Sequence, residues 1–243
     1  MSFPQTIMGK HGWEKLTTSA QKHKLGTHMQ IADREFIYAQ AGEDITVGKL
    51  VMGNVGTAAH QVDLAVSAAS AEATTVTLSG SLTIAKDQYK DGWLIFNDIG
   101  EEGHMYRVKG NTAVASATGC VITIDDEDGL VTAIAATQQV GLYENPYKEI
   151  EAHDANDVAH APLGWTCVDI TDTYYGWICV KGFTAALVDG TPGIGVPLIA
   201  SNGVDGAVEV YDEDGTVNLS PVGYMGPIAG VAGEYGLIKA NIG

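Results

Sequence analysis

The chain is poor in basic residues and in cysteine. Its 243 residues include 13 lysines and arginines against 30 aspartates and glutamates, for a formal net charge of −17. Because phosphate contacts need clustered basic side chains, this balance argues against nucleic-acid binding. The three cysteines, Cys120, Cys167 and Cys179, are an odd number without the spacing of a disulfide framework. We therefore expect buried free thiols in a protein that folds in a reducing compartment.

Long apolar runs are missing as well. No window approaches the roughly 18 consecutive apolar residues of a membrane-spanning helix. The N-terminal residues also lack an apolar stretch of signal-peptide length. We expect a soluble protein that is made in a cytoplasm and has no membrane partner.

Motifs that carry chemistry are equally scarce. The glycine-rich runs lack the Gly-Lys-Ser/Thr of a phosphate loop. The spacing of His153 and His160 is not that of zinc ligands, and the acidic loops at residues 125–129 and 212–215 lack the distal glutamate of an EF-hand. A Ser-His-Asp triad assembles only in space, so the sequence neither nominates nor excludes one. We expect no enzymatic activity, no cofactor and no bound metal.

Glycine is abundant, with 30 residues, and it cuts the apolar runs into short pieces. Residues 174–211 consist of such runs, separated by Gly, Pro and Asn-Gly turns and without a helical period. Short strands joined by tight turns at this density are typical of an all-β fold, a sandwich or a barrel. Tyr174, Tyr175 and Trp177 lie at strand spacing, which favours a place in the core or an interface over a sugar-stacking platform.

Alternation of apolar and polar residues predicts the individual strands. In residues 74–84 the apolar side chains share one face and the Ser and Thr side chains share the other, as in a half-buried strand. Residues 130–139 are the best candidate for a helix. Further strands are expected at residues 34–39, 45–52, 93–96, 105–109 and 120–124, and Gly48-Lys49 should interrupt the second of these with a bulge or bend.

The pattern divides the chain into three regions. The segment Asn145-Pro146-Tyr147 interrupts the strands and predicts a boundary. Residues 58–148 are expected to form an inserted β module, between residues 34–57 and 149–243, which form the two segments of a β-barrel or sandwich module. Residues 1–33 are polar and poor in alternation, so we expect an extended N-terminal arm.

The arm differs in charge from the rest of the chain. Within residues 1–30 four lysines stand against one glutamate, a charge of +3, whereas the other 9 basic and 29 acidic residues give −20. A basic arm on an acidic body suggests contact with an acidic neighbour, and a solvated, frayed terminus is the alternative. The candidate contact residues are Phe3, Lys10, Trp13, Lys15, Lys22 and Lys24.

The C-terminal residues 215–243 have few charges and apolar alternation on both faces. One thin module does not readily bury that much apolar surface, so self-association is expected. The apolar residues concerned are Val217, Leu219, Val222, Ile228, Val231, Leu237 and Ile238.

Three segments carry a further pattern. The first, residues 24–51, contains KLGT, REFIYA and GKLV. The second, residues 92–112, contains GWLIFND and GHMYRVKGNT. The third is YGWICVKG at residues 175–182, followed by the Pro- and Gly-cut strands up to Val208. Together these segments, which span most of the chain after about residue 24, resemble the head decoration (cement) proteins of tailed bacteriophages.

The resemblance implies a non-enzymatic virion protein, made in the host bacterial cytoplasm. Such proteins attach to the outer surface of a mature capsid, commonly as homotrimers at three-fold sites, and stabilise the head. The implied partners are the major capsid protein and further copies of the chain. Similar glycine-rich β patterns occur in tail and fibre proteins, so a tail or baseplate component, or a glycan-binding virion module, is the alternative.

Overall fold

The computed structural model describes residues 6–54, 56–98, 101–156, 160–211 and 220–242. The fold is all-β, with 44% strand and 3% helix, which confirms the predicted fold class. The helices of the described residues are two single 3-10 turns, η1 (Trp13–Lys15) and η2 (Ala58–His60). A search of that part of the chain finds no helix long and apolar enough to cross a membrane.

The chain folds as two compact units. Unit 1 contains residues 1–54 and 147–243, and unit 2 contains residues 55–146. The inserted module expected from the sequence, residues 58–148, starts three residues later and ends two residues later than unit 2. The return of the chain to unit 1 thus falls within the Asn-Pro-Tyr interruption of the strand pattern.

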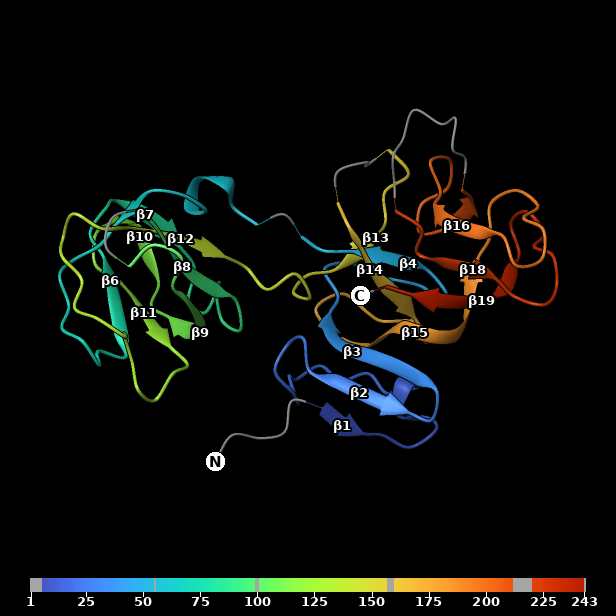
Figure 1. The fold of residues 1–243 in the computed structure, drawn as a ribbon, viewed down its shortest axis with the longest axis horizontal. Helices are drawn as coiled ribbons and strands as arrows, with labels where there is room; N and C mark the ends of the chain where they lie inside the picture. Colours follow the sequence, from blue (N-terminus) through green and yellow to red (C-terminus); the bar gives the residue numbers. More distant parts are fainter. Residues whose placement is uncertain (1–5, 55, 99–100, 157–159, 212–219, 243) are drawn as a thin grey trace. The chain divides into compact units, whose positions relative to one another are not determined.

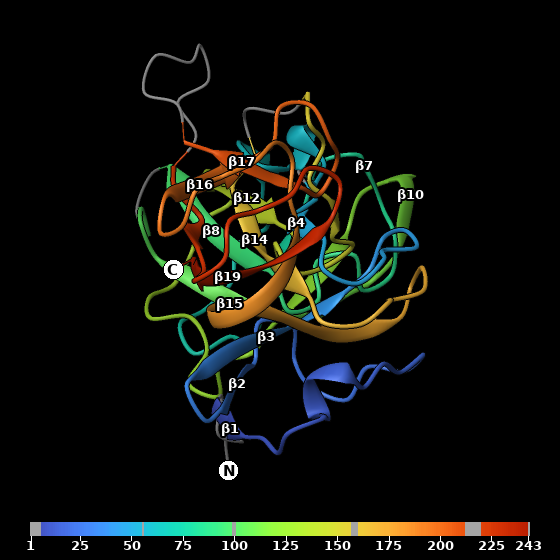
Figure 2. The same cartoon turned by 90° about the vertical axis from the view of Figure 1, so that its right-hand side faces the viewer.

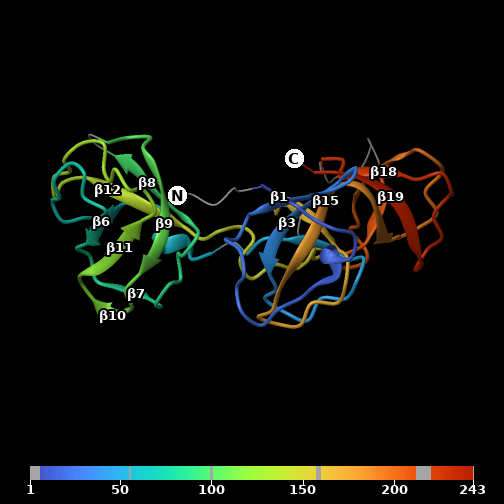
Figure 3. The ribbon, with the colours of Figure 1, turned by 90° about the horizontal axis from the view of Figure 1, so that it is seen from below.

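Unit 2 is a small, nearly closed barrel. Its six strands hydrogen-bond in the order β5-β12-β8-β9-β11-β6, and a bridge between Val66 and Leu78 connects the two ends of that order. Figure 3 shows these strands curving around one interior, which buried apolar side chains fill. The strands are β5 (Leu64–Ala65), β6 (Thr75–Leu78), β8 (Trp93–Asp98), β9 (Met105–Asn111), β11 (Cys120–Ile124) and β12 (Gln139–Tyr143), beside a separate pair of β7 (Leu82–Ile84) and β10 (Val114–Ala117).

The strand expected at residues 74–84 is interrupted. Residues 79–81 separate β6 from β7, so one predicted strand becomes two. The predicted apolar face is nevertheless correct, because Val76, Leu78 and Ile84 are all buried in the core of unit 2.

The helix expected at residues 130–139 is wrong. Leu130 and Ile134 are buried four residues apart, as they would be on one face of a helix. Their amide nitrogens, however, donate to the carbonyl oxygens of Ala73 (3.0 Å) and Ala69 (2.9 Å), far away in the sequence. Pairing with this neighbouring segment leaves the backbone extended, and the local pattern does not show that partner.

Unit 1 is built on one 11-stranded sheet whose main order is β1-β2-β3-β15-β19-β18-β16-β17. The longest strand, β15 (Tyr175–Leu187), pairs with β3 (Arg34–Gln40) along its first half and with β19 (Tyr235–Asn241) along its second half (Figure 1). The remaining strands are β1 (Thr6–Met8), β2 (His28–Ile31), β4 (Leu50–Met52), β13 (Glu151–Ala152), β14 (Pro162–Thr166), β16 (Pro197–Ala200), β17 (Val208–Val210) and β18 (Gly223–Met225).

The C-terminal half of unit 1 also curls into a barrel. A bridge between Val188 and Val208 links the end of β15 to β17, so the order β15-β19-β18-β16-β17 returns to its start. The interior contains Trp165, Leu198 and Ile238, each fully buried. At the other end of unit 1 the interruption expected at Gly48-Lys49 is confirmed, because the chain bends at Gly48 (φ 72°) and only β4, after it, is an extended strand.

The extended arm expected at residues 1–33 also differs from the structure. Residues 28–31 form β2, which pairs antiparallel with β3, and residues 6–8 form β1, which pairs parallel with β2. Figure 2 shows β1, β2, β3 and β15 following one another across the sheet. The described part of the arm is therefore a folded edge of unit 1, because its backbone groups find partners there.

Candidate interaction surfaces

The N-terminal segment, residues 6–31, is tied to unit 1 by backbone hydrogen bonds. Thr18 and Tyr175 exchange two of them, of 3.0 and 2.9 Å between nitrogen and oxygen. The amide of Lys22 donates to the hydroxyl oxygen of Tyr38 at 3.1 Å. Buried Met29 and Ile31 pack on Phe36 in the adjacent core cluster. The segment is thus fixed at its middle and at its end.

An aromatic cluster lies under this segment. The ring of Tyr38 lies 5.0 Å from Trp177 and 5.8 Å from Tyr175, and His23 contacts both Tyr38 (5.1 Å) and Trp177 (5.4 Å). Trp177 is 5% exposed, as expected for a core residue, whereas Tyr174 is 37% exposed. Burial lowers the pKa of His23, which favours the neutral ring in this position. The cluster holds the segment in place, and its buried tryptophan face is not available to a sugar.

The candidate contact residues of the N-terminal segment face solvent. Lys10, Trp13, Lys15, Lys22 and Lys24 are all exposed, and Phe3 lies outside the described residues. Three exposed apolar side chains lie among the lysines: Met8 (72%), Trp13 (38%) and Leu16 (57%). We call this mixed basic and apolar area, formed by residues 8–24, the N-terminal surface. It combines positive charge, which is rare in this chain, with apolar side chains whose burial by a partner is favourable.

A second surface lies on the outer face of the C-terminal barrel of unit 1. In the second half of β15 and along β19 buried and exposed residues alternate, and the register places Ala185 opposite Leu237 and Leu187 opposite Tyr235. Phe183 and Tyr224 both lie opposite Lys239, on the two sides of β19. We call the outward-facing apolar residues of β15, β18 and β19 the apolar strip. Its large members are Phe183 (43% exposed), Tyr224 (46%), Tyr235 (52%) and Leu237 (46%).

Only some of the apolar C-terminal residues expected to remain exposed on a single module do so. Val222 (3% exposed) and Ile238 (0%) belong to the core of the barrel and are not surplus. Ile228 (74%), Val231 (52%) and Leu237 do face solvent. Val217 and Leu219, the other two residues concerned, lie outside the described residues.

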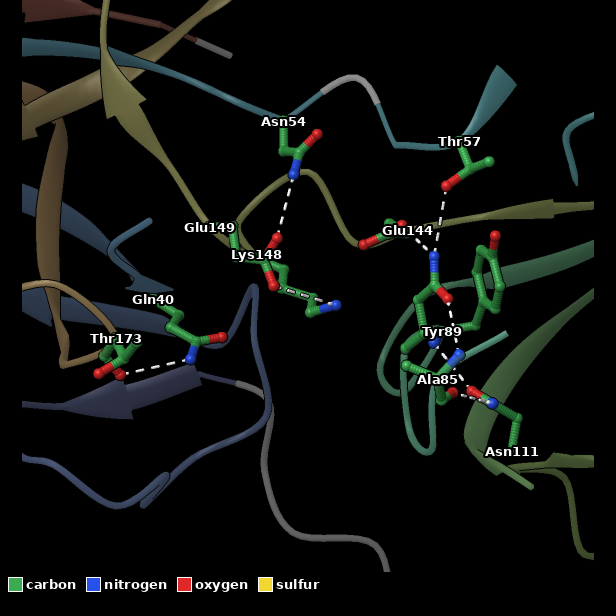
Figure 4. Close-up of polar contacts among 11 residues, drawn as sticks. Gln40, Asn54, Thr57, Ala85, Tyr89, Asn111, Glu144, Lys148, Glu149 and Thr173 are labelled. Carbon is green, nitrogen blue, oxygen red and sulfur yellow. Dashed lines mark hydrogen bonds and ion pairs between the residues drawn. The ribbon is translucent and has the colours of Figure 1, made fainter. Parts of the chain in front are cut away.

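The chain passes between the units at residues 54–55 and 146–147. The polar contacts described near these two points each join residues of the same unit (Figure 4). In unit 1 the Asn54 amide donates to Glu149 at 3.1 Å, and Lys148 lies 3.4 Å from the same carboxylate. In unit 2 the Gln88 amide donates to Glu144 at 3.0 Å, and the Tyr89 backbone amide donates to the Asn111 side chain at 2.9 Å. These contacts hold together residues of one unit, so we assign them a structural role.

Unit 2 contains a buried carboxylate that the sequence does not single out. Glu101, 1% exposed, accepts from the hydroxyls of Thr132 and Tyr106, the latter at 3.3 Å, and lies 2.5 Å from Nδ1 of His104. In a hydrolase triad the histidine stands between the hydroxyl and the acid. Here the carboxylate stands between the hydroxyls and the histidine, so His104 does not activate a nucleophile. The cluster fastens the loop at residues 101–104 to the chain near residue 132.

The other titratable candidates are placed as turns and core. The amide of Asp128 donates to the Asp126 side chain at 3.0 Å in an exposed turn, and residues 212–215 lie outside the described residues. His153 is buried, and its Nε2 lies 3.4 Å from the carbonyl oxygen of His160. Over the described ranges no group of three or more His, Cys, Asp or Glu side chains is placed to hold a metal ion.

Comparison with known proteins adds no relative. The scan of protein-family models, the search of curated proteins and the search of solved structures each found no match for this chain.

Proposed function

We propose that this chain is a structural virion protein that binds the outer surface of a phage capsid and stabilises the head. The sequence resemblance suggests that role, and the apolar strip is the observation that carries it. Monomeric soluble proteins rarely leave large contiguous apolar areas exposed, and such areas mark association surfaces. A rigid sheet presenting such a strip suits docking, which needs a fixed shape more than a pocket.

Further copies of the chain are the occupant that fits the apolar strip best. With a net charge of −17, two copies repel one another over most of their surface. The strip is poor in charge, and Lys239 is the charged residue between Phe183 and Tyr224. Burying the strip in a homotrimer removes apolar area from water without bringing acidic faces together.

The N-terminal surface is then the part that contacts the major capsid protein. It carries the basic charge that the rest of the chain lacks, so it is attracted to an acidic patch on the shell. Residues 6–31 are already folded onto unit 1, so binding does not have to order a free arm. The entropy cost of such ordering, which would lower the affinity, is therefore avoided. The protein stabilises the assembled shell by binding it in preference to its separated subunits.

The test uses purified phage heads. Heads stripped of this protein should release DNA at a lower temperature than decorated heads, and adding the purified protein back should restore resistance until the sites are filled. Imaging of virions with a labelled copy should place the label on the head. A label on the tail, together with equal release temperatures for both kinds of head, would refute the proposal and favour the tail or baseplate alternative.

A matched pair of variants tests the apolar strip. Leu237→Asp places a charge in the apolar strip, and Val62→Asp makes the same change at an exposed site in unit 2, where Val62 is 55% exposed. The first variant should be a monomer in solution and should bind heads with reduced cooperativity. The second variant should behave as the original protein in both respects. Equal behaviour of the two variants would contradict a role for the strip.

A further inference from the structure

Cys167 and Cys179 lie together on one side of unit 1. Cys179 is fully buried in β15, opposite Trp165 of β14, and Cys167 is half-buried, one residue after β14 ends. The two side chains belong to the same apolar cluster, and the β14–β15 register, continued by one residue, places Cys167 diagonally opposite Cys179. The expectation of buried free thiols is confirmed for Cys120 and Cys179, and Cys167 is the more accessible exception.

A guanidinium group lies beside this pair. Nη2 of Arg34 is 3.6 Å from Sγ of Cys167, and its Nη1 is 3.7 Å from the buried carboxylate of Glu14 in the N-terminal segment. The guanidinium also lies over the ring of Phe36, 4.7 Å from its centre. Its Nε is buried and has no hydrogen-bond partner among the described residues. A cation held this way in an apolar cluster favours a negative charge on a neighbouring sulfur.

We propose that Cys167 and Cys179 form a reactive dithiol that hydrogen peroxide converts to an intramolecular disulfide, with Arg34 stabilising the attacking thiolate. The thiolate sulfur donates an electron pair to one peroxide oxygen, the O–O bond breaks, and a sulfenic acid and water form. The second thiol loses its proton and attacks that sulfur, which releases a second water. In sum, two thiols lose two protons and two electrons, and one peroxide becomes two waters.

The electrostatics of the pair support this reactivity. The neighbouring Cys167 thiol lowers the pKa of Cys179, against the effect of burial, and Arg34 lowers it further. The pKa of Cys167 is raised, first by the neighbouring Cys179 thiol and then by burial. Cys179 is therefore the sulfur of the pair that ionises more readily. Cys120 has a raised pKa because of burial, so it is the matched unreactive thiol.

Bond formation requires a movement that the fold allows. Diagonal neighbours on adjacent strands have Cβ atoms about 7 Å apart, and a disulfide needs about 3.8 Å. The pairing of β14 with β15 ends at Thr166, and the next bridge of this segment is that of Ile170 with Ile45. Cys167 lies between these two points, outside the ladder, so it can approach Cys179 without breaking a pairing bond. The disulfide then fastens residues 167–169 to β15.

The experiment is peroxide oxidation of the full chain followed by thiol counting and tryptic mass mapping. Residues 149–181 form one tryptic peptide with both thiols, and residues 110–148 form another with Cys120. The protein should lose two of its three thiols, and peptide 149–181 should lose two hydrogen atoms while peptide 110–148 is unchanged. Two free thiols in peptide 149–181 after oxidation, or a disulfide-linked dimer, would overturn the proposal.

Variants separate the roles of the residues. Cys120→Ser should keep disulfide formation, and Cys167→Ser should abolish it. Arg34→Met should slow oxidation about tenfold, the effect of roughly one unit in thiol pKa, and Arg34→Lys should restore part of the rate because it keeps the charge. Circular dichroism of each variant shows whether it is folded. An unchanged rate in folded Arg34→Met would refute the part assigned to Arg34.

Discussion

Leu237 and Ile238 are neighbours on β19 with opposite environments, and substituting each in turn tests the apolar strip. Leu237 is 46% exposed and Ile238 is fully buried in the C-terminal barrel. Fully burying a leucine side chain contributes about 1.5–3 kcal/mol, so covering the exposed part of Leu237 contributes about 1 kcal/mol per copy. Three copies in a trimer give about 3 kcal/mol, or about a hundredfold in the association constant.

Leu237→Ser should therefore weaken self-association about a hundredfold and leave the free energy of unfolding of the monomer within about 0.5 kcal/mol of its original value. Ile238→Ala should instead destabilise the monomer by about 2–5 kcal/mol, because it leaves a cavity in the barrel. Sedimentation over a range of concentrations measures association, and urea unfolding measures stability. Val62→Ser, at an exposed site of unit 2, is the control. The reasoning fails if Leu237→Ser associates as strongly as this control, or if it lowers stability as much as Ile238→Ala.

Three further outcomes are expected. Lys10→Gln, Lys15→Gln and Lys22→Gln together should weaken attachment to heads at low salt, and the difference from the original protein should shrink at high salt, as binding measured at two ionic strengths will show. Tyr38→Phe removes the acceptor of the Lys22 amide and should cost about 0.5–1.5 kcal/mol, seen as faster hydrogen exchange in residues 18–24. Burial lowers the pKa of His60 from its ordinary 6.5, more than nearby Glu144 raises it. The unfolded chain then binds the proton first as pH falls, so unit 2 should lose stability below about pH 6.5, and His60→Gln should flatten that dependence in thermal melts.

The strands that alternation predicts are those with one buried face. Residues 93–96, 105–109 and 120–124 each lie within an observed strand whose burial alternates, since a period of two is what a half-buried strand requires. Residues 34–39 also lie within a strand, β3, but Phe36 to Ala39 are buried on both of its faces. Residues 130–139 show the limit of that reasoning. Their buried positions recur at a spacing of four, which a helix and an irregular extended segment can share, and the carbonyls that decide between them lie about sixty residues away in the chain.

The N-terminal segment was harder to predict because its structure depends on partners elsewhere. Its lysines and histidines suggest an unfolded arm, but His28, Met29, Gln30 and Ile31 alternate between exposed and buried sides, and that short signal marks β2. The candidate lysines are exposed because the segment packs Leu25, Met29 and Ile31 on unit 1 and turns its lysines to solvent, beside the exposed Met8, Trp13 and Leu16. Composition indicates the character of this surface, but only the pairing of β2 with β3 gives it a fixed shape.

That fixed shape changes the experiment that tests the N-terminal surface. Deleting residues 1–31 would remove β1 and β2 and uncover Phe36, which is fully buried in one cluster with Met29 and Ile31 of β2. Losing that cover would weaken unit 1 as well as attachment, so a deletion cannot separate the two effects. Substituting exposed lysines removes the charge and leaves the β2–β3 ladder intact. A loss of head binding by the lysine variant, with an unchanged unfolding midpoint in urea, would assign the attachment to the surface charge, and unchanged binding would exclude it.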